Sequence, residues 1–139
     1  MFIRGTLYTD GGARGNPGPA GIGVVLRWTD DHGQHEQAYK EYIGATTNNV
    51  AEYRALCKGF ALAKGKGATH VECFLDSELV VKQLNREYRV KDKELQALFL
   101  QVWNCASAFT RCVFRHIPRE ENSQADALVN EAIDDALKN

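Results

Sequence analysis

The sequence predicts an α/β fold in which a mixed sheet of five strands is flanked by helices. Three observations lead to this prediction. The first 44 residues hold three strand-like segments without a helical pattern between them, a helical segment follows, and short apolar strands then alternate with helices. Meandering strands followed by this alternation predict the order βββαβααβα. With 139 residues, 44% of them apolar, the chain is expected to form one domain over residues 1–139.

The expected elements follow one another along the chain. Alternating apolar residues predict strands over 2–9, 20–28 and 35–44, and the polar turn at 30–33 indicates antiparallel hairpins. The remaining elements are expected to be a helix over 47–66, a strand over 69–76, helices over 77–86 and 92–109, a strand over 111–117 and a helix over 122–137.

Charge and composition limit the partners and the location. The formal net charge is -1, so a surface that binds a polyanion must be local. No apolar run approaches the ~20 residues of a membrane span, and the N-terminus lacks the pattern of a signal peptide. Hence no membrane partner and a cytoplasmic location are expected. The four cysteines show no zinc-ligand spacing and are interpreted as buried, reduced thiols, although their even number leaves a disulfide open.

Four carboxylates occupy positions where a solvated charge is not expected. Asp10 ends the first strand and Asp76 ends the fourth, and ligand sites in such sheets gather at strand ends. Glu52 and Asp126 lie near helix starts, on faces that are otherwise apolar. Burying these groups unpaired costs several kcal/mol each, so they need hydrogen-bond donors, basic residues or cations as partners.

Each acid alone also has a structural interpretation. Asp10 could form an Asx-turn, and Glu52 could be an acid near a helix start that the helix dipole stabilises. Asp76 could cap the helix after it, and Asp126 could form a capping box with Ser123. Together they are harder to explain in this way, because the topology brings them toward one end of the sheet. A hard divalent cation removes their repulsion. Two such ions about 3.5–4 Å apart stabilise the attacking and the leaving oxygen when a phosphodiester is cleaved.

Four sequence blocks carry a resemblance to a known family. They are TDGGARGNPGPAGIG at 9–23, TTNNVAEYRAL at 46–56, LDSELVVKQL at 75–84 and HIPREENSQADALVN at 116–130. In acid order, motif context and spacing, the chain resembles type 1 ribonuclease H over essentially its full length. The resemblance implies the ribonuclease H-like fold, a five-stranded mixed sheet with helices, in agreement with the order of elements above.

The resemblance implies a function and a metal site. The function is an endoribonuclease that hydrolyses the RNA strand of RNA/DNA hybrids and leaves 5′-phosphate and 3′-hydroxyl ends. Asp10, Glu52, Asp76 and Asp126 match the family's DEDD residues, which hold two divalent metal ions, Mg²⁺ or Mn²⁺. Asp10 bridges both ions in this scheme, Asp126 shares the ion that activates water, and Glu52 and Asp76 hold the other.

His116 stands where the family has a mobile-loop histidine that assists proton transfer or product release. Its charge change near neutral pH makes this role feasible. The alternative is a partly exposed histidine at the end of a strand.

The resemblance also implies substrate contacts. Gly11, Asn16, Asn48 and Asn49 match positions facing the minor groove of the RNA strand, where an amide can meet a 2′-hydroxyl. Thr47 matches a residue that contacts a phosphate of the DNA strand, which suits a helix N-terminus. Helix capping by residues 46–49 is the structural alternative.

Two features depart from the family pattern. The long basic protrusion of many members is missing, and a small basic cluster remains in its place, formed by Lys82, Arg86, Arg89, Lys91 and Lys93. Solvated charges are the plain interpretation of this cluster, so weaker, salt-sensitive hybrid binding is expected. Glu78 stands where some members have a glutamine that contacts a base, and an ionised glutamate cannot donate that bond.

Three functional hypotheses remain: the hybrid-specific endonuclease, a module that binds hybrid without cutting it, and a nuclease of the same superfamily that also cuts double-stranded RNA or DNA. The presence of all four acids argues against the second. Asn48 and Asn49 argue against DNA as the cut strand. A monomer without an obligate protein partner is expected.

Overall fold

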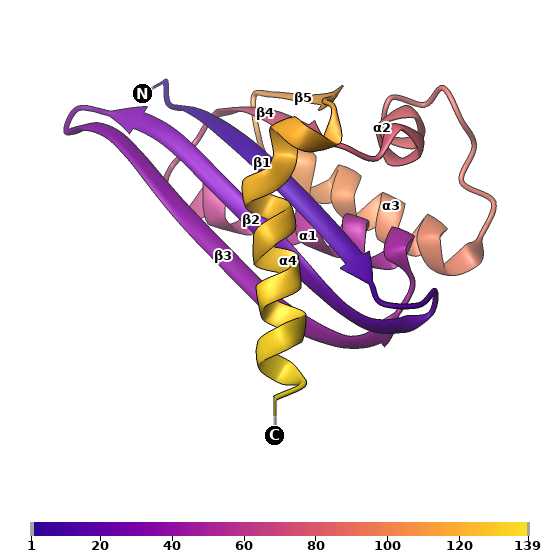
Figure 1. Ribbon diagram of the computed structural model, residues 1–139. Helices are drawn as coiled ribbons and strands as arrows, with labels where there is room; N and C mark the ends of the chain where they lie inside the picture. The colour runs from indigo at the N-terminus through magenta and orange to yellow at the C-terminus, as the bar shows by residue number, and fades with distance from the viewer. Residues whose placement is uncertain (1, 139) are drawn as a thin grey trace.

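The computed structural model describes residues 2–138, and Figure 1 shows their arrangement. The strands are β1 (Arg4–Ala13), β2 (Gly18–Asp30), β3 (Gly33–Thr46), β4 (His70–Leu75) and β5 (Arg111–His116). The helices are α1 (Asn48–Gly65), α2 (Glu78–Leu84), α3 (Lys93–Ala106) and α4 (Ser123–Ala136), with a 3-10 turn, η1 (Arg119–Asn122), before α4.

The strands form one mixed sheet in the order β3-β2-β1-β4-β5. The neighbours β1, β2 and β3 pair antiparallel, whereas β4 pairs parallel with β1 and with β5. The predicted five-stranded mixed sheet and the order of its elements are therefore confirmed.

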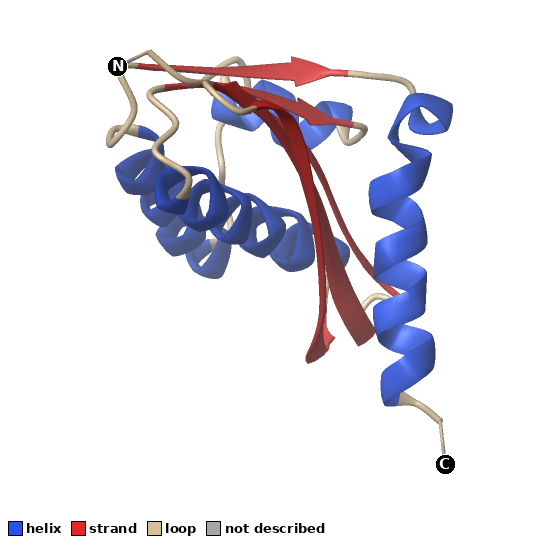
Figure 2. Cartoon of the chain, turned by 90° about the vertical axis from the view of Figure 1, so that its left-hand side faces the viewer, coloured by secondary structure: helices blue, strands red, loops and turns tan. Residues whose placement is uncertain are grey.

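The helices lie on both faces of the sheet. Figure 2 shows α4 alone on one face, with the long helices α1 and α3 on the other. Glycines on both sides of the helix–sheet contacts permit this packing, because a Cβ atom on Gly59 of α1 would press on Leu7, and one on Gly23 of β2 would overlap Ala125 of α4. The main core lies between the sheet and α1–α3, and its largest fully buried side chains include Tyr53, Phe60, Leu7, Leu26, Leu56, Leu75 and Leu84.

The first strand is longer than predicted, and Asp10 does not end it. Strand β1 continues through the glycine-rich stretch to Ala13, with Asp10 opposite Gly23 and Ala13 opposite Ala20 of β2. The turn-rich composition suggested a loop here. Backbone pairing overrides it at Gly11 and Gly12, since Gly11 lets the backbone of α1 approach closely, and the turn is confined to residues 14–17.

Other differences are small. The chain enters α4 through the 3-10 turn η1, which the sequence did not predict, and α4 begins at Ser123. Among residues 2–138, no helix combines the length and apolarity that a membrane crossing requires. The four cysteines are free thiols, although only Cys73 is fully buried.

Candidate active site

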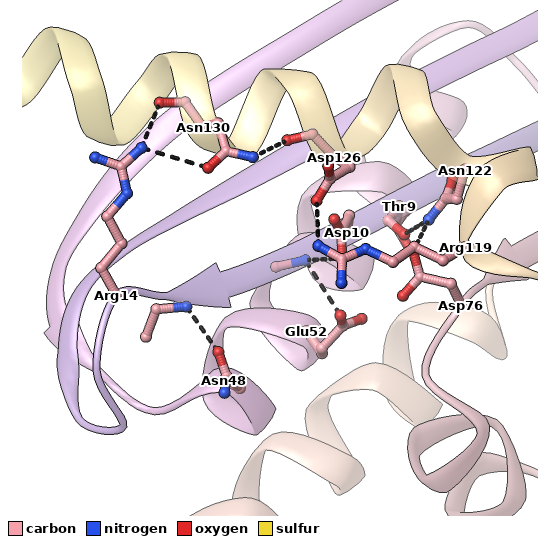
Figure 3. A network of polar contacts seen from close by, with 12 residues as sticks. Thr9, Asp10, Arg14, Asn48, Glu52, Asp76, Arg119, Asn122, Asp126 and Asn130 are labelled. Atoms are coloured by element: carbon pink, nitrogen blue, oxygen red, sulfur yellow. Dashed lines mark hydrogen bonds and ion pairs between the residues drawn. The ribbon is translucent and has the colours of Figure 1, made fainter.

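Three carboxylates meet at one end of the central strands. Asp10 lies on β1, Glu52 lies in α1, and Asp76 directly follows β4. One carboxylate oxygen of each lies within 4.8 Å of the others, a grouping able to hold a metal ion (Figure 3). Because β1 and β4 are parallel neighbours, Asp76 leaves the sheet near Asp10, and α1 brings Glu52 against them from one face.

The fourth acid approaches from the opposite face. Asp126 lies in the first turn of α4, and its side chain is 33% exposed. Its Oδ1 atom is 3.7 Å from a guanidinium nitrogen of Arg119, an exposed residue of η1 (Figure 3). All four acids line one open cavity of about 450 Å³, together with Arg119.

Asp10 and Glu52 are buried and poorly compensated. The backbone N–H of Gly11 donates to Asp10 Oδ1 at 3.0 Å and to Glu52 Oε1 at 3.4 Å. Glu52 Oε2 is buried without a hydrogen-bond partner among the described residues. Buried polar atoms in natural proteins are rarely left without a hydrogen-bond partner. Contact with a metal ion is one explanation of the exceptions.

Burial and like charge raise the proton affinity of both groups. Burial, with the nearby charges of Asp76 and Asp126, raises the pKa of Asp10 to about 7. Burial, with the charges of Asp10 and Asp76, raises the pKa of Glu52 well above its usual range. A divalent cation among these oxygens would remove both effects, since it offsets the repulsion and replaces the lost solvent. The donor set of hard carboxylate oxygens suits Mg²⁺ or Mn²⁺.

The structural interpretations of the single acids do not hold. Ser77, and not Asp76, caps α2 by accepting from Val80 N–H at 3.3 Å. No side-chain cap closes the start of α4, so Asp126 and Ser123 form no capping box. Glu52 lies beyond the first turn of α1. Asp10 lies inside a paired strand and not in an Asx-turn.

Sequence reasoning missed Asn122 and Arg119. Asn122 is 1% exposed, and its Nδ2 donates to the backbone oxygen of Thr9 at 2.9 Å and to Asp76 Oδ2 at 3.0 Å. Neither partner is near Asn122 in sequence. The one available signal was a polar residue a helical turn before Asp126.

The residues expected to contact substrate gather beside the acids. Asn48 Oδ1 accepts from Ala13 N–H at 2.8 Å, and Asn16 Oδ1 accepts from Asn48 N–H at 3.0 Å, so these amides tie the β1–β2 connection to α1. Asn48, Asn49 and Gly11 line the cavity. Thr47 caps α1 by accepting from Val50 N–H at 3.3 Å, which confirms the capping alternative for this residue.

His116 lies apart from these residues. It ends β5, is exposed, and is not among the residues that line the acidic cavity. Glu78 lies near enough to feel its charge: the pKa of the Glu78 carboxyl is lowered first by the hydrogen bond to Lys82 and least by His116. Glu78 and Lys82 form an ion pair at 2.9 Å, so Glu78 is an ionised acceptor.

The basic cluster surrounds the connection between α2 and α3. Its member Lys82 is engaged by Glu78 and lies over the ring of Tyr88. Arg86 lies over the ring of Trp103, at 4.9 Å from its centroid.

Comparisons with known proteins agree with this geometry. The family model described as "Reverse transcriptase-like" matches residues 8–132. The "Bifunctional protein Rv2228c" of Mycobacterium tuberculosis is 45% identical over 132 residues, which are 95% of this chain and 36% of that protein. The chain thus spans about a third of the length of this relative.

A shorter relative and a solved structure match more completely. The "Ribonuclease H" of Chromohalobacter salexigens is 35% identical over 146 residues, covering 95% of this chain and 85% of that protein. The structure of LC11-RNase H1 in complex with RNA/DNA hybrid is 48% identical, with a TM-score of 0.84, and the match covers 96% of this chain and 99% of that one.

Proposed function

Because the chain belongs to the type 1 ribonuclease H family, we propose that it is an endonuclease that hydrolyses the RNA strand of RNA/DNA hybrids. The products are 5′-phosphate and 3′-hydroxyl ends. The observation that carries the proposal is the cluster of Asp10, Glu52 and Asp76, in which a buried Glu52 oxygen has no hydrogen-bond partner among the described residues.

Two divalent ions, Mg²⁺ or Mn²⁺, would be held by all four acids, Asp10, Glu52, Asp76 and Asp126. When bound, such ions activate the attacking water and stabilise the leaving oxygen. Asp10 would be the central ligand, because its carboxylate lies near those of Glu52 and Asp76 and the charge of Asp126 also acts on it. The partly exposed Asp126 would hold the ion that activates water, and the buried Glu52 would hold the ion on the leaving-oxygen side together with Asp76.

The remaining site residues bind and orient the substrate. The amide NH₂ groups of Asn16 and Asn48 remain to meet an RNA strand, since their side-chain oxygens are used within the protein. We propose that they, with Asn49 and the backbone of Gly11, contact 2′-hydroxyls in the minor groove. Thr47, at the start of α1, meets a phosphate of the DNA strand. His116 assists proton transfer or product release from outside the cavity.

We propose further that residues 1–139 act as one ribonuclease H domain and as a monomer. All four acids come from one chain, so the site needs no second copy. Four free thiols support a cytoplasmic location.

The test is cleavage of an end-labelled RNA strand, offered in an RNA/DNA hybrid, in an RNA/RNA duplex and alone. Mg²⁺ and Mn²⁺ are supplied separately. Asp10→Asn is the inactive variant, and Asp31→Asn, a matched change in the exposed turn before β3, is the control. We expect cleavage of the hybrid alone, lost in Asp10→Asn at saturating metal and retained in Asp31→Asn.

Three other outcomes are informative. Cleavage of RNA/RNA as well would keep the mechanism and widen the substrate. Binding of hybrid without cleavage in either metal would make the protein a binding module. Near-normal turnover by Asp10→Asn would refute the two-metal assignment.

A further inference from the structure

Asn122 occupies a buried position between β1, which carries Asp10, and Asp76, which directly follows β4. Its Nδ2 atom donates one hydrogen bond to the backbone oxygen of Thr9, the residue before Asp10, and one to Asp76 Oδ2 (Figure 3). One amide nitrogen therefore uses both of its hydrogens, one on β1 and one on the residue that follows β4.

The orientation of this amide is determined by its partners. Both are acceptors, so turning the amide over would set its oxygen against a carbonyl and a carboxylate. The amide oxygen, Oδ1, is buried and has no hydrogen-bond partner among the described residues. Such a group costs free energy, so the two donated bonds are the interactions that hold the side chain here.

The position of Asn122 in the chain adds a third connection. It is the last residue of η1, four residues before Asp126 of α4. Asn122 thereby ties the start of α4 to β1 and β4, although α4 packs on the opposite face of the sheet from α1. Three of the four acids are placed by elements that meet at this one side chain.

We propose that Asn122 is a positioning residue, which orients the Asp76 carboxylate and the start of α4 and so sets the affinity of the site for divalent metal. It fixes Asp76 Oδ2 by a hydrogen bond and leaves the other carboxylate oxygen to a metal. It does not contact substrate. This inference rests on the proposed function, because the metal ligands belong to that function.

A purely structural role is the competing explanation. Asn122 could merely satisfy the Thr9 carbonyl under the start of α4. That role predicts a loss of stability without a change in metal affinity. The positioning role predicts a loss of metal affinity. Removing a partner that orients a metal ligand typically lowers the affinity for the metal by about 10–100-fold.

The experiment compares Asn122→Ala with a control of similar burial. Gln83→Ala removes a buried amide that accepts from the Tyr53 hydroxyl at 2.7 Å and lies outside the acidic cavity. Each protein is titrated calorimetrically with Mn²⁺ in the absence of substrate. Hybrid cleavage is then measured against Mn²⁺ concentration, and thermal unfolding is followed in chelator.

We expect Asn122→Ala to weaken Mn²⁺ binding by about tenfold or more. The Mn²⁺ concentration for half-maximal cleavage should rise in parallel, cleavage should recover at high Mn²⁺, and the KM for hybrid should not change. Gln83→Ala should lower the unfolding temperature and leave Mn²⁺ binding unaltered. If Asn122→Ala does not fold, Asn122→Ser, whose hydroxyl has a single hydrogen to donate, is expected to show the same loss.

Other results overturn the inference. An Asn122→Ala protein with wild-type Mn²⁺ affinity would reduce the residue to a structural role, and a raised KM at unchanged metal affinity would make it a substrate contact. If the wild-type protein cleaves hybrid, either result refutes only the role of Asn122. If the wild-type protein neither binds Mn²⁺ nor cleaves hybrid, the proposed function fails and this inference fails with it.

Discussion

Gly11 of β1 and Ala51 of α1 approach so closely that no side chain fits between them. A Cβ atom on Gly11 would overlap the carbonyl group of Ala51 and the amide nitrogen of Glu52. The same approach brings Glu52 Oε1 to the Gly11 N–H, which also donates to Asp10 Oδ1, so the distance between strand and helix also sets the distance between the two buried acids.

Gly11→Ala should therefore damage both stability and metal binding. The overlap is with backbone, which can move only if α1 shifts away from β1, so we expect a loss of roughly 2 kcal/mol or more of unfolding free energy. Chemical denaturation and Mn²⁺ titration would measure the two effects. Gly65→Ala is the control, because a Cβ atom there meets nothing within 4 Å and should be neutral or slightly stabilising. A Gly11→Ala protein with wild-type stability would contradict the packing described.

The buried acids should make the metal-free protein less stable as the pH rises. The pKa of Asp10 is about 7 in the folded protein against an ordinary value of 3.8, so between these values the folded state binds more protons than the unfolded chain. The unfolding free energy then falls with rising pH across this window. The raised pKa of Glu52 acts in the same direction. Thermal unfolding in chelator from pH 5 to pH 8 would measure the fall.

Asp10→Asn should reduce this dependence. An uncharged amide at residue 10 removes the charge that burial opposes, so the metal-free variant should gain at most about 4 kcal/mol over the wild type at pH 8. Asp31→Asn, in an exposed turn, should keep the wild-type slope. A loss of stability in Asp10→Asn at pH 8 would show that the Asp10 charge is compensated without metal.

His116→Ala should slow turnover without abolishing it. The side chain is exposed at the end of β5 and does not line the cavity of the acids, so it can assist a step but does not hold the ions. We expect a loss of at most about 100-fold in kcat, at the low end for general acid–base groups. His32→Ala, in the exposed β2–β3 turn, is the control in the same assay. A variant as inactive as Asp10→Asn would give the histidine a more central role.

Hybrid binding should weaken steeply with salt, because phosphate contacts release counterions. Binding by catalytically inactive Asp10→Asn can be followed by fluorescence anisotropy from low to physiological salt. Arg89 and Lys91 are exposed in the α2–α3 connection. Replacing them by alanine should make the slope of the logarithm of the binding constant against the logarithm of salt concentration shallower by about one per lost phosphate contact. Lys138→Ala, near the C-terminal end of α4, should leave the slope unchanged. A salt response that is flat in all proteins would show that phosphate contacts are not the main anchor.

Hydrophobic periodicity was sufficient to predict the five strands, the four helices and their order. It failed at the glycine-rich stretch after Asp10, where composition typical of a turn indicated a strand end. The structure pairs Gly11 and Gly12 into β1, where α1 requires a close approach to the backbone of Gly11. That requirement arises from tertiary packing and is invisible in a local pattern.

The four acids could be found from the sequence because Asp10 and Asp76 follow apolar strand patterns, Glu52 and Asp126 lie on apolar helix faces, and all four fall in the blocks that resemble ribonuclease H. The role of Asn122 could not be found in this way. A buried asparagine before a helix looks like a cap, and its true partners are Thr9 and Asp76, 113 and 46 residues away in the chain. Arg119 was missed for a similar reason, since an exposed arginine in a turn is ordinary until its neighbour Asp126 is known.

The last helix of the chain packs alone on its face of the sheet. Helix α4 supplies Asp126, and η1 supplies the anchoring turn before it. A chain emerging from the ribosome therefore presents three of the acids before the fourth has been synthesised. The nascent protein can thus complete most of its core between the sheet and α1–α3 while its acidic site remains unfinished.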